Sequence, residues 1–225
     1  IFTAVIYMFI NILAVTLINL LLRGVLSIIA GFIFAILSSS LISNYLYLLY
    51  NAITYNRITF HNFKDGFTQY LWKVYGIFFV AWIASYALSI VINLIGSVGV
   101  VLYSLLSLLA LILLNPLPET IYQKHYSSVE SIKYAFDFIK ENWLNWFVPN
   151  IILFGIIYLI TGNLVLDMFT THLALGFRLD IQSLIRYLVA QSIFSFTMIY
   201  RGHLFNLLST STRRKRMYMN RLYED

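Results

Sequence analysis

Few side chains in this sequence could carry chemistry, and those few are dispersed. The 225-residue chain has 4 histidines and 0 cysteines, so thiol catalysis, disulfides and cysteine-ligated metal sites are excluded. No glycine-rich phosphate loop, HExxH or GxSxG is present. No two histidines stand three or four positions apart, the helical spacing that would let both reach one metal ion. We therefore predict no metal site and no cofactor. The four histidines are His61, His125, His172 and His203.

The carboxylate of Glu119 is the most suggestive single group. It follows Pro116 and Pro118, which lack an N–H and restrict the residue before them, so we expect the preceding helix to kink or end there. The carboxylate could accept from freed amides, pair with a Lys or Arg, or bind a ligand. The simplest interpretation is an interfacial cap. The alternative is an enzyme site at the membrane interface, in which Glu119, His125 and His61 would have to converge.

Neutral polar side chains inside apolar segments form a second candidate set. Small and amide side chains at such positions are typical of hydrogen bonding and close packing between membrane helices. They could instead line a polar cavity for a substrate or a lipid headgroup. The candidates for that cavity are Ser39, Ser43, Asn44, Asn93, Glu119 and Gln191. Ionisable groups are almost absent from the apolar segments, which argues against a proton pump built on carboxylate relays.

The composition indicates a membrane protein. The chain is 60% hydrophobic and 11% charged, whereas soluble domains carry about 25% charged residues. Several apolar segments reach the roughly 20 residues that a membrane-spanning helix needs. The first residue is Ile1, so we expect that the sequence lacks its natural start. The segment 1–22 is too long for the apolar core of a signal peptide, and we expect a retained helix there.

We predict an all-α integral membrane bundle of six transmembrane helices in three hairpins, with two amphipathic helices on the cytoplasmic side. The second span could continue as helix toward Tyr55. The fifth could end at Gly162 or continue irregularly to Phe169. The expected spans are residues 1–22, 25–50, 74–95, 98–114, 146–169 and 181–208, followed by a basic tail at 209–225.

The placement of Lys and Arg predicts the orientation. Most of them fall on the side that holds both termini, so this side should be cytoplasmic. A basic cluster in the tail would attract anionic lipid, at about 1 kcal/mol per charge. Membrane orientation and lipid contact are sufficient to explain the net charge of +6, so we expect no nucleic-acid partner. The cluster is Arg213, Arg214, Lys215 and Arg216.

The more polar of the two amphipathic segments follows Pro118. Its apolar residues recur at spacings of three and four, which places them on one helical face. They are Val129, Ile132, Phe136, Ile139 and Trp143. Ser128 is the expected N-cap. We predict a short helix from Ser128 to about Trp143 that lies on the membrane surface or under the bundle.

The two amphipathic segments also suggest an internal repeat. A shift of about 69 positions places Thr59 on Ser128 and Phe67 on Phe136. It superposes the expected caps and the apolar stripes. A shift of about 71 aligns more aromatic residues but breaks the stripe, so we favour the first register. Chance similarity between amphipathic helices is the alternative explanation.

Two sequence segments resemble a known membrane-protein signature. They are LPETIYQKHYSSVESIKYAFDFIKENWLNWF and ITFHNFKDGFTQYLWKVYGIFF. The signature is that of bacterial membrane proteins related to the membrane domain of glycerophosphodiester phosphodiesterases and to the uncharacterised YciC-like family. The resemblance implies a bacterial inner-membrane protein and agrees with six helices. The catalytic residues of those phosphodiesterases belong to a separate soluble barrel, so none is carried over to the matching residues.

The resulting functional prediction is a non-enzymatic membrane protein located in the bacterial inner membrane. It would be a permease-like protein or accessory subunit that handles a lipid or small amphiphile or assists a membrane complex. The expected partners are the bilayer, anionic lipids at the cytoplasmic face, and a membrane protein or a second copy of the chain. The alternatives are an interfacial enzyme that uses Glu119 and His125, and a scaffold that binds a partner protein.

Overall fold

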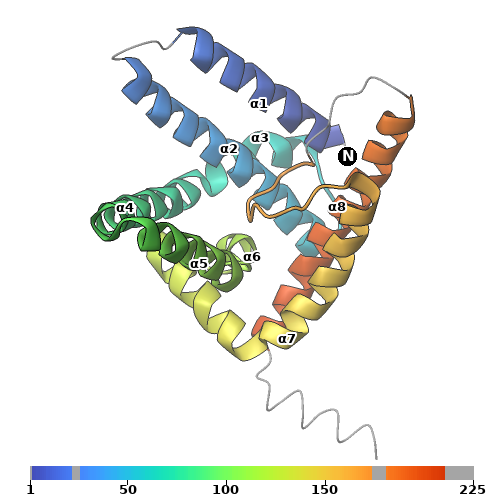
Figure 1. The fold of residues 1–225 in the computed structure, drawn as a ribbon. Coiled ribbons are helices and arrows are strands. Elements are labelled where there is room, and N and C mark those ends of the chain that lie inside the picture. Colours follow the sequence, from blue (N-terminus) through green and yellow to red (C-terminus); the bar gives the residue numbers. More distant parts are fainter. Residues whose placement is uncertain (1, 22–25, 174–180, 211–225) are drawn as a thin grey trace, which may run out of the picture.

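A computed structural model describes residues 2–21, 26–173 and 181–210 of the chain (Figure 1). All regular secondary structure in these residues is α-helical, as predicted. The helices are α1 (Phe2–Leu21), α2 (Leu26–Tyr55), α3 (Phe60–Gln69), α4 (Leu71–Ile95), α5 (Ser97–Leu113), α6 (Leu117–Gln123), α7 (Ser128–Thr161) and α8 (Ile181–Thr210).

Four helical segments in the described ranges are long and apolar enough to cross a membrane. They are Gly31–Tyr55, Phe60–Ile95, Val98–Gln123 and Ser128–Thr161. Multi-pass insertion therefore has a physical basis in this chain. Neither α1 nor α8 is among these segments, so the described residues support four of the six predicted spans and the other two are not shown. The sequence of α8 is less apolar and carries Arg186 and Arg201.

Three helical arms spread from a common centre (Figure 1). The first arm is the hairpin of α1 and α2, and the second is the hairpin of α4 and α5. The third is the last part of α7 beside α8. The centre, which we call the hub, contains α3, α6 and the parts of α2, α4, α7 and α8 that pack around them. Its apolar core includes Leu46, Val74, Ile121, Ala135 and Phe205, all at most 1% exposed.

Helix α7 corrects the prediction of a separate surface helix and a fifth span. Residues Ser128–Thr161 form one helix that contains Pro149, and the ribbon turns sharply within it (Figure 1). A proline removes one helical hydrogen bond and clashes with the preceding turn, which bends a helix without ending it when packing holds both sides. The helix ends at Gly162, whose φ of 72° is left-handed. Residues 163–169 are therefore not helical.

The helix starts correct the predicted caps and the repeat register. Thr59 caps α3 as expected, but Ser127, not Ser128, caps α7. Both starts are capping boxes, completed by Asn62 and Glu130 respectively. The two caps lie 68 positions apart, so the shift of 69 is wrong at this point. The Ser128 hydroxyl instead donates to the Lys73 carbonyl at 2.9 Å, which ties α7 to α4.

The remaining boundaries agree closely with expectation. Helix α2 continues to Tyr55, and α5 ends just before the first proline of the Pro116/Pro118 pair. The turn between the third and fourth expected spans is short, because α5 already begins at Ser97. Gly96, with φ of 71°, makes the reversal alone, a conformation that glycine adopts without strain.

Candidate functional site: two cavities beside a polar hub

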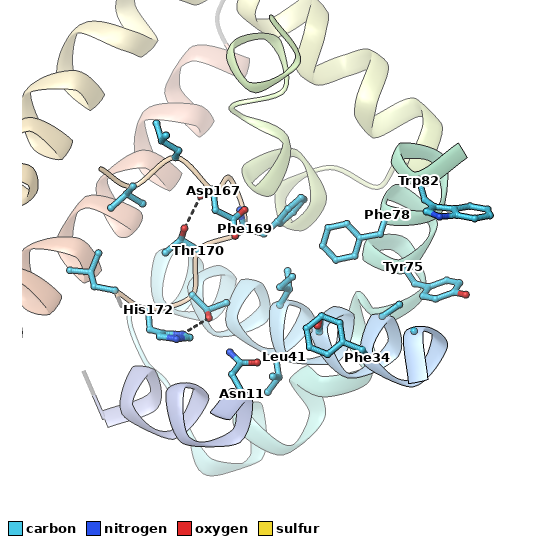
Figure 2. A pocket seen from close by; sticks show the side chains of 18 of the residues that line it. Asn11, Phe34, Leu41, Tyr75, Phe78, Trp82, Asp167, Phe169, Thr170 and His172 are labelled. Carbon is cyan, nitrogen blue, oxygen red and sulfur yellow. Dashed lines mark hydrogen bonds between the residues drawn. The ribbon is translucent and has the colours of Figure 1, made fainter. Parts of the chain in front are cut away.

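A large cavity lies between α2, α4 and the loop of residues 162–173. Its volume is about 990 Å³, at the upper end of the roughly 300–1,000 Å³ typical of ligand sites. Figure 2 shows Phe34 and Leu41 from α2 facing the aromatic side chains of α4 across this space. The α4 residues in the lining are Tyr75, Phe78, Phe79 and Trp82. Most of the wall is therefore aliphatic or aromatic.

Polar groups gather on the loop side of this cavity (Figure 2). The Asp167 carboxylate accepts from the Phe169 amide at 3.0 Å, and the Thr170 hydroxyl donates to the Asp167 carbonyl at 2.7 Å. The Thr171 hydroxyl lies 2.9 Å from Nδ1 of His172. Burial lowers the pKa of His172, so the neutral imidazole is favoured at neutral pH. An apolar chamber with one polar end matches the shape of an amphiphile.

Gln191, one of the predicted cavity residues, holds this loop in place. Its side-chain oxygen accepts from the Leu173 amide at 3.0 Å, and the residue is 1% exposed. The loop thus packs back onto α8, although it contains no helix. Gln191 itself does not line either cavity. Its place in the structure is that of a positioning residue for the cavity wall.

The serines and Asn44 of α2 join helices in the hub. The Ser43 hydroxyl donates to the Gly66 carbonyl at 2.7 Å and accepts from the Tyr70 amide at 2.7 Å. Asn44 donates to the Phe63 carbonyl and accepts from the Tyr7 hydroxyl. Ser39 is also buried, whereas Asn93 is exposed on α4. None of these four residues lines either cavity.

Glu119 forms a buried ion pair in the hub. Its two carboxylate oxygens accept from Nε and Nη2 of Arg201 at 2.7 and 3.1 Å, the two-point geometry in which such pairs are strong. Nη2 also donates to the Asn115 carbonyl at 3.0 Å. The Arg201 guanidinium lies 4.9 Å from the centre of the Trp146 ring, whose indole N–H donates to Asn115 at 2.9 Å. The pair therefore joins α6, α7 and α8.

The residues of the alternative enzyme site are not joined in the described structure. Both oxygens of Glu119 are engaged by Arg201, while His125 is exposed. His61 lies on the surface of α3, 3.1 Å from Asp65. Among the described residues, no hydrogen bond links Glu119 to either histidine. Glu119, His125 and His61 therefore do not form an acid–base pair with one another in the described structure.

A second cavity, of about 310 Å³, lies between α5, α7, α8 and the 162–173 loop. Arg201, Asn150 and Asn115 are in its lining. Asn150 was missed by sequence reasoning, although it follows Pro149 in the middle of an apolar segment, where an amide is unusual. Asn11 of α1, which was not among the predicted cavity residues, lines the larger cavity. The basic cluster Arg213–Arg216 lies outside the described residues.

Comparison of the chain with protein-family models, curated proteins and solved structures finds no match in any of the three.

Proposed function

We propose that this polytopic membrane protein holds a lipid or another amphiphile in its larger cavity, as a permease-like protein or an accessory subunit does. The observation that carries the proposal is the shape and lining of that cavity. Aromatic side chains of α4 and aliphatic ones of α2 would contact an acyl chain, and the polar groups of the 162–173 loop would face a headgroup. Burial of apolar chain surface against such walls stabilises a complex by roughly 25 cal/mol per Å².

The membrane arrangement belongs to the same proposal. Helix α4 has 25 residues, or roughly 37 Å at 1.5 Å per residue, which exceeds the hydrocarbon thickness of about 30 Å. The hub would then lie at one membrane face, and the turn between α4 and α5 at the other. Helices α1 and α8 would complete six spans. The Lys and Arg distribution favours a cytoplasmic hub and cytoplasmic termini in a bacterial inner membrane, consistent with the family resemblance, and Arg213–Arg216 would contact anionic lipid.

The test is native mass spectrometry of the protein extracted gently in its own lipids, with a variant that fills the cavity. Gly31 lines the larger cavity, and a Cβ added there meets nothing within 4 Å, so Gly31→Leu places a side chain into open space. The matched control is Gly155→Leu on α7, where the added Cβ is equally unobstructed and which lines only the smaller cavity.

We expect the original chain and Gly155→Leu to retain one amphiphile, and Gly31→Leu to retain it at least tenfold less. A chain that carries no small molecule, or equal retention by all three proteins, would contradict the proposal. A partner protein retained in fixed stoichiometry without a lipid would favour the scaffold alternative.

A further inference from the structure

The smaller cavity is lined by Arg201, a buried cation that does not use all of its hydrogen-bond donors. Arg201 is 4% exposed. It uses Nε and Nη2 for Glu119 and the Asn115 carbonyl. Within the described ranges, Nη1 donates no hydrogen bond, although a guanidinium has five N–H donors. Arg201 is also part of the cavity lining. One edge of the guanidinium is therefore fixed by Glu119, and donors remain for another group.

Asn150 supplies an unsatisfied acceptor to the same cavity. Its amide nitrogen donates to the Trp146 carbonyl at 2.6 Å, which fixes the direction of the side chain. Its Oδ1 is buried without a partner among the described residues, and the residue is 3% exposed. Buried polar atoms in native proteins nearly always have a partner, so such an acceptor calls for an explanation. A ligand with a hydrogen-bond donor would supply it.

The surrounding side chains favour a small, charged ligand. Phe154, Phe194 and Met198 complete the apolar part of the lining. Glu119 already balances the charge of Arg201, so the apolar wall acts by strengthening hydrogen bonds from the remaining guanidinium donors. The Asp167 carboxylate also belongs to the lining and opposes an anion. A volume of about 310 Å³ accommodates a headgroup-sized molecule near the lower limit for ligand sites.

We propose that this cavity binds a phosphate group that carries a hydroxyl. The charged oxygens would accept from Nη1 of Arg201, and the hydroxyl would donate to Oδ1 of Asn150. The phosphate group could belong to a lipid headgroup or to a free phosphate, because both present the same chemistry to these two residues. The two cavities share residues 164–167 and Thr170 of the loop, but Arg201 and Asn150 line only the smaller one, so this site has its own binding groups.

The experiment uses two probes on the purified full chain in a non-ionic detergent. Isothermal titration calorimetry measures the binding of inorganic phosphate. Native mass spectrometry measures retention of phosphatidylglycerol, whose headgroup has hydroxyls, against phosphatidylcholine, whose headgroup has none. Gly155→Leu fills the cavity, and Gly31→Leu is the matched control in the other one. Asn150→Leu removes the acceptor, and Asp167→Asn removes the opposing charge.

We expect binding of inorganic phosphate, or the excess of retained phosphatidylglycerol over phosphatidylcholine, to fall at least tenfold in Gly155→Leu and in Asn150→Leu, whereas Gly155→Leu still retains an amphiphile in the larger cavity. Binding of phosphate or phosphatidylglycerol should be unchanged in Gly31→Leu and tighter in Asp167→Asn. Saturable binding of phosphate identifies a free-phosphate site. Retention of phosphatidylglycerol without phosphate binding identifies a headgroup site. Failure of both probes, equal retention of the two lipids without phosphate binding, or unchanged binding by Gly155→Leu would overturn the proposal.

Discussion

The roles of Glu119 and Arg201 are determined by their contact with each other in the folded chain. The sequence allowed three roles for Glu119, namely a cap, an ion pair or a ligand contact, and the structure shows the ion pair. Its partner lies 82 positions away, and no local pattern connects the two residues. Arg201 stands near the end of α8, where a long cationic side chain would otherwise extend toward the interface. Their pairing depends on how α6 and α8 pack.

We predict that the two charges depend on each other for stability. Because removal of one partner leaves an unpaired buried charge, Glu119→Leu or Arg201→Met alone should lower the free energy of unfolding by about 3–5 kcal/mol. The double variant should recover most of that loss. A double-mutant cycle of unfolding in detergent measures the coupling. If the two single losses simply add, the pair does not have the role that we assign to it.

At the scale of elements, local signals predicted helix existence well and helix continuity poorly. The start of α3 at Thr59 and the end of α7 at Gly162 could be predicted from the sequence, because each residue acts on its immediate neighbours. The continuity of α7 through Pro149 could not be predicted, because a proline ends some helices and only bends others. The position of the 162–173 loop could not be predicted either, since it depends on the hydrogen bond between Gln191 and Leu173.

Gly202 is the most crowded of the described glycines. A Cβ built on this residue would lie 2.1 Å from Ile53 and 2.6 Å from the Tyr122 hydroxyl. The Gly202 carbonyl also accepts from Gln123 at 2.8 Å. Small residues are the usual means by which membrane helices approach each other this closely. We infer that α2, α6 and α8 pack together only because this position has no side chain.

Gly202→Ala should therefore lower the free energy of unfolding by about 1–3 kcal/mol through overpacking. The matched control is Gly155→Ala, which has open space around its Cβ and should be neutral or more stable by up to about 1 kcal/mol. Thermal unfolding of the two variants in the same detergent compares them. Equal midpoints would show that the hub tolerates a side chain at Gly202.

At the scale of the whole molecule, the apolar surface is as informative as the core. Leu94 on α4 is 83% exposed and Val98 on α5 is 66% exposed, so this arm presents apolar side chains outward along its length. In water such a surface would promote aggregation, but in a bilayer it contacts lipid. The sequence predicted the apolar helices, because length and hydropathy determine them. It could not predict that the arms spread apart and leave a cavity between α2 and α4.

The most direct test of this account asks whether the arm of α4 and α5 crosses the bilayer away from the hub. The chain has 0 cysteines, so a single introduced cysteine can be labelled without background from other thiols in the protein. Leu94→Cys marks the tip of the arm, and His125→Cys marks the exposed turn between α6 and α7. A membrane-impermeant maleimide is applied to intact cells and again after the membrane is permeabilised. We predict that one of the two cysteines is labelled in intact cells and the other only after permeabilisation. Labelling of both from the same side would contradict the membrane arrangement proposed here.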